Sequence, residues 1–339
     1  MPKSVKAVIG LSLGLVTLLT LLISAFAWPT SELEPRSLPL VVAGPEAAVT
    51  QIESQLAANA GDDAFEITAV ADREEAVEAI EDREAYGAII STSSIHRVAG
   101  SQGPEFLVAS AASANVAQQL TQMATAMGAE TGTQPQVTDV VASAEDDPRG
   151  IVFGASALPL VIGGIMAGAI TSLVLTRTRD RVAAAFLIAV GGGLAMTAVV
   201  QGWLGALEGS YLANAGVVAL GILAVALPII GLRHLIGPAG VGIVALLILL
   251  VGNPLSGITS APEMVPFGWL GQLMPPGAAG SALRGFSFFD GAGTTVPLIV
   301  LVCWAGFGLL LTVLPHREKG SAEDAEAGRT ERDLDAVAR

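Results

Sequence analysis

The chain has 339 residues, of which 52% are hydrophobic and only 14% are charged, and its formal net charge is −14. Soluble domains carry roughly 25% charged residues and nucleic-acid-binding proteins need a basic surface, so this composition argues against both classes. Several apolar stretches reach the ~20 residues that cross a ~30 Å hydrocarbon core. The sequence therefore predicts an α-helical polytopic membrane protein.

The first apolar stretch occupies residues 1–28 and is predicted to be an N-terminal membrane anchor. Lys3 and Lys6 lie at its start, and Ala25-Phe26-Ala27 resembles the small-residue cleavage site of a secretory signal. The apolar run of about 20 residues is longer than the 7–15 residues of a signal-peptide core. This length favours an uncleaved anchor over a cleaved signal.

Residues 29–150 are predicted to form an inserted α/β domain. This segment contains 20 Asp and Glu against 5 Arg, so it carries the acidity of the chain. Because the predicted strands alternate with helices, the sheet is expected to be largely parallel. The expected strands are 38–44, 65–71, 86–92, 105–110 and 137–143, and the expected helices are 47–58, 72–84 and 113–127. Asp72 and Glu75 have the spacing of a capping box.

Residues 151–315 are predicted to form a five-span membrane domain, which brings the total to six spans. The spans are expected near 152–175, 182–204, 211–232, 235–253 and 296–315. Asp146 and Asp147 precede the first of these and are expected to lie in a solvated linker, with a weak cation site as the alternative. Residues 316–339 are charged and lack apolar periodicity, so they are predicted to be a disordered cytoplasmic tail.

The basic residues near the span ends predict an orientation. Positive residues gather in the cytoplasmic loops of membrane proteins. With six spans, all short basic loops fall on one side, so both termini are expected in the cytoplasm and residues 29–150 outside. The residues that carry this prediction are Lys3, Lys6, Arg177, Arg179, Arg181, Arg233, Arg317 and Lys319.

An apolar segment rich in proline, residues 252–290, separates the last two predicted spans. Proline lacks an N–H and disfavours helix at the preceding residue, so this segment is expected to hold short re-entrant or interfacial helices. Ser260 is the expected N-cap of a helix starting at Pro262, and Pro275-Pro276-Gly277 is expected to end a helix over 267–274. A further short helix is expected over 280–289. Either an interfacial lid or an outer gate would fit this pattern.

The sequence contains none of the common catalytic or nucleotide-binding motifs. It has no GxxxxGK[ST] loop, so active transport would need an ATPase from another chain or an ion gradient. No catalytic constellation is visible, and neither a metal nor a cofactor is predicted; Cys303 is the single cysteine. The sequence therefore predicts that the protein is not an enzyme.

Polar and small residues inside the spans predict helix packing. No charge lies within the last five predicted spans away from their ends, which gives little support to ion-coupled transport. Gln201 and Asn214 are expected to bond between helices, with a substrate path as the alternative. Gly164 and Gly168 form a GxxxG pattern, which predicts a close helix contact within the chain or between two chains.

The proline-rich segment also resembles a known family. The sequences Asn253-Pro254-Leu255-Ser256-Gly257, Pro262-Glu263 and Leu273-Met274-Pro275-Pro276-Gly277, with Pro266 and Arg284, are similar to the last external loop of type-2 ABC exporter permeases. Among these, the phage-infection-protein (YhgE/Pip) branch is the most similar. The layout of one span, a large external domain and five further spans is similar too.

This resemblance implies a function. It implies a permease subunit in a bacterial plasma membrane that exports a hydrophobic or amphipathic compound, works as a homodimer or heterodimer, and uses a separate ABC ATPase. The family's ATPase-coupling loop corresponds here to 176–181, with Arg177, Arg179 and Arg181. The implied substrate path or outer gate comprises Asn253, Pro254, Pro262, Glu263, Trp269, Pro275, Pro276 and Arg284.

The chain also departs from the family pattern. The loop that would couple to the ATPase is only about six residues long, and few residues precede the first span, where an interface helix is usual in the family. The alternative is a non-transporting envelope protein whose extracytoplasmic domain binds a partner or scaffolds an assembly.

Overall fold

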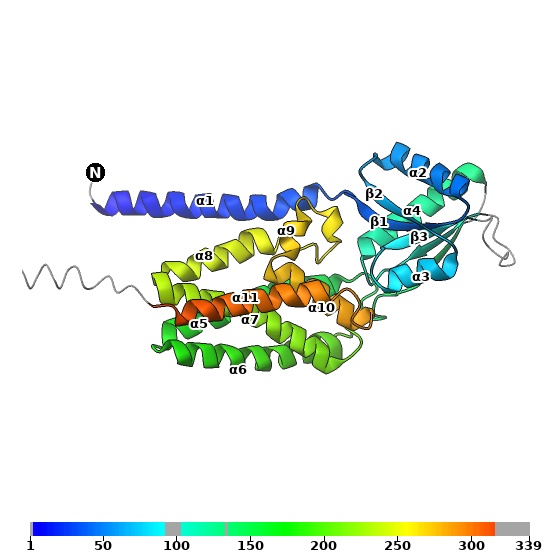
Figure 1. The fold of residues 1–339 in the computed structure, drawn as a ribbon. Coiled ribbons are helices and arrows are strands. Elements are labelled where there is room, and N and C mark those ends of the chain that lie inside the picture. Colours follow the sequence, from blue (N-terminus) through cyan, green and yellow to red (C-terminus); the bar gives the residue numbers. More distant parts are fainter. Residues whose placement is uncertain (1–2, 92–102, 133–134, 316–339) are drawn as a thin grey trace, which may run out of the picture.

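The computed structural model describes residues 3–91, 103–132 and 135–315, and the predicted tail 316–339 lies outside these residues. Figure 1 shows a bundle of helices at one end of the molecule and a small sheet with its own helices at the other. The two halves meet where the proline-rich segment lies.

Among the described residues, five helices are long and apolar enough to cross a membrane, as expected for a helical membrane protein. The predicted span 235–253 instead forms a shorter apolar helix, Ala239–Gly252, which consists of α8 (Ala239–Leu247) and a π-helical turn (Ile248–Gly252). At about 1.5 Å per residue it is about 21 Å long, less than a ~30 Å hydrocarbon core. The five long helices are α1 (Lys3–Ser31), α5 (Ile151–Val174), α6 (Thr178–Thr197, continued as a π-helix to Trp203), α7 (Tyr211–Ile236) and α11 (Thr295–Val313).

The bundle is built around α7. This helix packs against α5, α6 and α11, and 72% of its most apolar window is buried, against 0% for α1. Gly164 and Gly168 lie on the face of α5 that contacts α7: a Cβ on Gly168 would come 2.8 Å from Ile229 Cβ. The small residues therefore allow the backbones of α5 and α7 to approach closely.

Hydrogen bonds join the helices at both ends of the bundle. At the end away from the sheet, His234 on α7 contacts Thr178 Oγ1 (3.3 Å) and the Leu314 carbonyl (3.1 Å). At the sheet end, the buried Asn214 amide donates to Gln201 Oε1 (3.0 Å), which confirms the predicted bond between helices. Figure 1 shows that α1 begins and α11 ends at the end away from the sheet.

The sheet has five strands in the order β2-β1-β3-β4-β5. Only the β3–β4 pair is antiparallel, so the prediction of a largely parallel sheet is confirmed. Helices α2 (Glu46–Ala60) and α4 (Ala114–Thr131) pack on one face, and α3 (Arg73–Glu81) packs on the other. The strands are β1 (Leu38–Ala43), β2 (Phe65–Val70), β3 (Gly87–Ile90), β4 (Glu105–Val108) and β5 (Gln136–Asp139).

Acidic residues cap two of the helices. The Asp72 carboxylate accepts from the Glu74 and Glu75 amides at the start of α3, while the Glu75 carboxylate accepts from Ala71 N–H (2.8 Å), one residue before the position of a standard capping box. Asp147 does not lie in a solvated linker as predicted. It is 5% exposed, and its carboxylate accepts from the amides of Ile151 and Phe153 (both 2.8 Å) in the first turn of α5.

The proline-rich segment forms three helical pieces: a 3₁₀ turn (Pro262–Met264), α9 (Gly268–Gln272) and α10 (Pro275–Phe288). Two details of the sequence prediction are wrong. α9 ends before Pro275 as predicted, but the next helix begins at Pro275 and not at 280, because proline's fixed φ and missing N–H suit the first helical turn. Ser260 does not cap the 3₁₀ turn, whose N-cap is Ala261 without a side-chain bond.

Gly168→Ala is expected to lower the stability of the bundle by about 1–3 kcal/mol, because its methyl group would overpack the α5–α7 contact. Gly163→Ala, on the same helix, is the matched control, since a Cβ at Gly163 would have no neighbouring atom within 4 Å. Thermal unfolding of both purified variants in detergent measures the difference. Equal melting temperatures for the two variants would show that the close approach is not needed.

Candidate functional site

The residues 253–294, called here the docking segment, contact both faces of the sheet. Ala261 and Met264 belong to the apolar cluster under α2 and α4, which includes Leu40 of β1. Phe289 belongs to the cluster under α3, which includes Ile80. The segment that connects two helices of the bundle is therefore part of the hydrophobic core of the sheet on both of its sides.

Backbone hydrogen bonds fix the docking segment to the linker between α1 and β1. The amide of Arg36 donates to the Glu263 carbonyl (3.0 Å), and the amide of Glu34 donates to the Met264 carbonyl (3.2 Å). The Arg36 guanidinium also donates to the Met264 carbonyl (3.0 Å). These bonds join the end of α1 to the same 3₁₀ turn that enters the core of the sheet.

A polar seam lies between the sheet and the docking segment. The Tyr86 hydroxyl, just before β3, donates to Glu263 Oε2 (2.7 Å). Burial, and then the neighbouring Glu263 carboxylate, raise the pKa of Tyr86, so its hydroxyl remains a donor. The Arg83 guanidinium donates to the Ser281 carbonyl (2.9 Å) and lies 5.4 Å from the centre of the Phe289 ring. Both bonds cross from the sheet half to the bundle half.

Arg284 lies inside the junction and not on its surface. It is 7% exposed, donates to the Ile258 carbonyl (2.9 Å), and stacks 4.8 Å from the centre of the Phe153 ring. A cavity of about 30 Å³ lies between Arg284 and Asp147, which is room for about one water molecule. The guanidinium therefore supports the loop that carries Ile258 from within.

A groove of about 430 Å³ lies where α1, α5 and the start of the docking segment meet, and we call it the α1–α5 groove. Phe26 and Leu33 line it from the end of α1 and the following linker, and Ala155 and Leu158 line it from α5. None of its lining residues is charged. Its polar groups are backbone amides and carbonyls together with the side chains of Thr30, Asn253, Ser256, Thr259 and Ser260.

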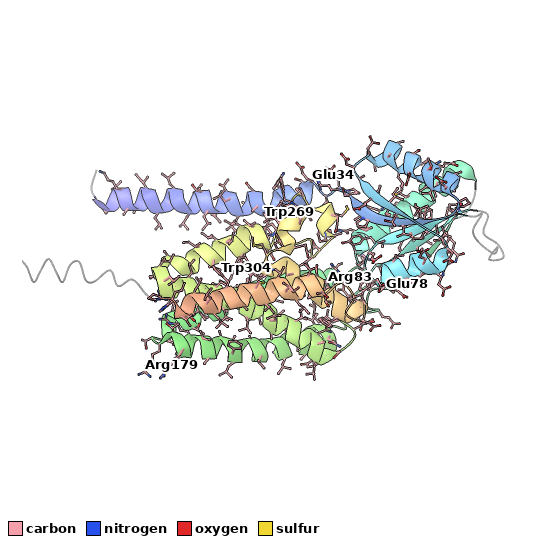
Figure 2. The ribbon with its side chains drawn as sticks, viewed as in Figure 1. Glu34, Glu78, Arg83, Arg179, Trp269 and Trp304 are labelled. Atoms are coloured by element: carbon pink, nitrogen blue, oxygen red, sulfur yellow. The ribbon has the colours of Figure 1, made fainter. Side chains whose placement is uncertain are left out.

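The structure divides the eight residues of the predicted path or gate among different places. Asn253 and Pro254 line the α1–α5 groove. Pro262 and Glu263 lie in the 3₁₀ turn of the seam, and Pro275 and Pro276 are buried at the start of α10. Trp269 is 64% exposed on α9, near the sheet-side end of the bundle in Figure 2.

The three predicted coupling arginines lie at the opposite end of the bundle. Figure 2 shows Arg179 there, far from the sheet, and both Arg177 and Arg179 are exposed. Arg181 is partly buried, and its Nε donates to the Leu175 carbonyl at the end of α5 (2.8 Å). Two of the three guanidinium groups are therefore presented outward.

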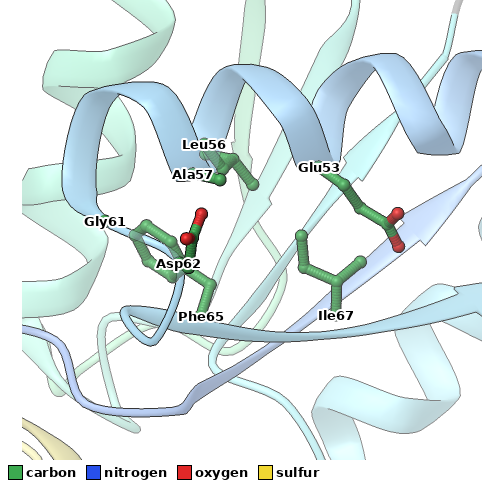
Figure 3. Close-up of a pocket in the computed structure, with 7 residues that line it drawn as sticks. All are labelled: Glu53, Leu56, Ala57, Gly61, Asp62, Phe65 and Ile67. Carbon is green, nitrogen blue, oxygen red and sulfur yellow. The ribbon is translucent and has the colours of Figure 1, made fainter.

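A smaller cleft of about 230 Å³ lies beside the edge strand β2, beneath α2 (Figure 3). The carboxylates of Glu53 and Asp62 lie at its sides, and Phe65 and Ile67 form its floor. Its lining contains no histidine, cysteine, serine or lysine. In the described ranges, no three His, Cys, Asp or Glu side chains are grouped as a metal site would require.

Sequence reasoning missed Arg83 and Tyr86, which face the docking segment. Arg83 has a left-handed backbone (φ 63°) and lies in a turn between α3 and β3. In the sequence it is one of several charges in a helical stretch, and nothing marks it as a residue of the junction, where it is partly buried. A weak signal was available for Tyr86, since it is one of only two tyrosines in the chain.

Comparison of the chain with family models, with curated proteins and with solved structures finds no match in any of the three. The proposals below therefore rest on the geometry of the described residues and on the motif in the docking segment.

Tyr86→Phe is expected to destabilise the junction by about 1–3 kcal/mol, because it removes a hydrogen bond to a partly buried carboxylate. Hydrogen–deuterium exchange should then rise in peptides covering 253–290. Glu263→Gln keeps an acceptor oxygen at this place and is expected to have a smaller effect. Unchanged exchange in Tyr86→Phe would show that this bond does not hold the segment.

Proposed function

We propose that the protein is the membrane permease subunit of an ABC-type exporter, which moves a hydrophobic or amphipathic compound outward with a separate ATPase. The observation that carries the proposal is the α1–α5 groove. Its walls are apolar, it has no charged lining residue, and it contains Asn253 and Pro254 of the family-like motif. A groove of this composition suits an apolar compound with few polar groups.

The proposed topology has six passes, with both termini in the cytoplasm and residues 29–150 outside a bacterial plasma membrane. The basic residues Arg177, Arg179 and Arg233 lie at the end of the bundle away from the sheet, as the positive-inside rule requires. The short helix Ala239–Gly252 provides the fifth pass. Its missing length is made up by the turns that follow, which α9 and α10 contact through the bonds from Gln272 to the Ser256 carbonyl and from Arg284 to the Ile258 carbonyl.

The seam gives the proposed exporter a mechanical connection. Glu263 contacts the sheet, and Asn253 lines the groove ten residues earlier in the same docking segment. Arg36 ties the linker after α1 to this segment as well. A change in the angle between sheet and bundle would therefore move α1 and one wall of the groove together, which is what opening or closing an outer exit needs.

The partners of the proposed exporter would bind at two surfaces. The exposed Arg177, just before α6, and Arg179, in the first turn of α6, are the proposed contact for the ATPase. In the part of the chain that the structure describes, α1 contacts the turn Ile248–Gly252, its Trp28 lies against Phe267, and it exposes most of its apolar residues. Lipid or a second permease chain, in a homodimer or heterodimer, would cover this surface.

One observation favours a second candidate function. Only residues 175–177 separate α5 from α6, and Arg181 folds back onto Leu175. Such a compact connection offers little surface to an ATPase. The second candidate is a non-transporting envelope protein whose extracytoplasmic domain binds a partner or scaffolds an assembly.

Ala155→Trp is expected to block the α1–α5 groove, because Ala155 is exposed and lines it. Cells carrying this variant should become several-fold more sensitive to an exported amphipathic compound, at an unchanged amount of protein. Ala195→Trp on the exposed face of α6 is the matched control and should behave as the unaltered chain. If gene deletion changes sensitivity to no compound in a broad amphipathic panel, the export proposal is wrong.

Arg179→Glu, which reverses an exposed charge, is expected to weaken co-purification of an ABC ATPase with the full chain. Replacing an attractive surface charge by a repulsive one weakens the binding free energy by on the order of 1 kcal/mol. The amount of ATPase recovered should therefore fall several-fold. Arg149→Glu, near the sheet end, is the control. Absence of any ATPase from the unaltered preparation would favour the second candidate function.

A further inference from the structure

A second hollow lies in the sheet half. It has a volume of about 600 Å³, within the usual range for ligand sites, and runs between α2 and α4; we call it the α2–α4 cleft. The residues of α4 that line it follow the i, i+3, i+4 spacing of one helix face. They are Gln119, Gln122, Met123, Ala126 and Met127. Helices α2 and α4 lie on the same side of the sheet (Figure 1), and the cleft is lined by residues of both.

The lining of the cleft is uncharged, although residues 29–150 carry 20 acidic side chains against 5 arginines. Ile89 and Phe65 form an apolar floor, and the methionines of α4 provide flexible side chains that adapt to irregular apolar shapes. Gln119 and Gln122 place amide groups in the same wall. This combination fits a linear apolar chain with a neutral hydrogen-bonding group at one end.

The cleft lies next to the proposed exit from the membrane. Pro35 lines the α2–α4 cleft, and Leu33 lines the α1–α5 groove. Since consecutive residues span at most ~3.6 Å each, the two hollows have lining residues whose Cα atoms are at most about 7 Å apart. Trp28 in the last turns of α1 is of the type that marks a membrane boundary.

We propose that the α2–α4 cleft binds one acyl chain of a lipid-like amphiphile that arrives from the α1–α5 groove. This inference rests on the proposed export function and narrows its substrate class to acyl amphiphiles. The acyl chain lies along the apolar floor, and the side-chain amides of Gln119 and Gln122 donate hydrogen bonds to the carbonyl group at the head of the amphiphile. Water then covers the polar head at the open side of the cleft.

The test uses the full chain in lipid nanodiscs with a photoactivatable acyl chain. One arm contains a phospholipid with a diazirine at the end of its acyl chain, and the other contains a free fatty acid with the same group. After illumination and digestion, mass spectrometry locates the labelled peptides. We expect label on α2 and α4 peptides in addition to the bundle, and the arm with stronger label identifies the source of the chain.

Two tryptophan variants make the test specific. Ala126 is exposed and lines the cleft, so Ala126→Trp should fill it. The label on α2 and α4 should then fall about tenfold, which is the affinity lost when about two methylene groups of the acyl chain are no longer buried. Thr125→Trp is the control, because Thr125 is exposed on the same helix but does not line the cleft. Gln122→Trp should act as Ala126→Trp does.

Label on the bundle alone in both arms would overturn the acyl site. Equal label on α2 and α4 in Ala126→Trp, Gln122→Trp and Thr125→Trp would overturn it as well, since contact at the outer surface would then explain the label. A third outcome separates the two proposals: Ala126→Trp and Gln122→Trp remove the label from the cleft, but no ATPase co-purifies with the protein and no compound is exported. This outcome would support the acyl site and reject the export function. The two proposals can therefore fail separately.

Discussion

The rest of the structure depends on the docking of residues 253–294 into the core of the sheet. Met264 is buried with the strands on one face, and Phe289 is buried on the other. A single connection between two helices of the bundle thus shares its hydrophobic burial with a separate α/β unit. Because apolar side chains on both faces must leave the core together, sheet and bundle cannot separate without a large loss of buried area.

Polar groups give this apolar contact its register. Tyr86 and Glu263 bond across the junction, while Arg83 reaches the Ser281 carbonyl and Arg284 reaches the Ile258 carbonyl. A buried polar group without a hydrogen-bond partner costs free energy. Because a shift of the junction would break these bonds, each bond holds its partner in position. The same fixed backbone forms one wall of the α1–α5 groove. The groove, the α2–α4 cleft and the seam adjoin one another through one linker, in which Leu33 lines the groove, Pro35 lines the cleft and Arg36 bonds to Glu263.

Local patterns predicted the elements well and their connections less well. The strand at 38–44 and the cap at Asp72 follow from short-range rules, and both are present. The helix start at Pro275 was misjudged because proline both ends helices and begins them, and the local sequence does not say which. Asp147 was misjudged because its role as a cap depends on the buried position of the first turn of α5.

The sequence by itself determined the apolar helices, the alternation that makes a mostly parallel sheet, and the charge difference between the two halves, because these depend on composition and on periods of 3.6 and 2 residues. Only the tertiary structure decided that Arg284 is enclosed, that Asn253 and not Trp269 lines a groove, and that Leu33 and Pro35 face two neighbouring hollows. Contacts between residues 177 or 198 positions apart in the chain, such as Tyr86 with Glu263 and Arg83 with Ser281, leave no periodic trace in the sequence. These contacts form because docking of the two halves removes apolar surface of both from water. The polar seam then selects a single arrangement.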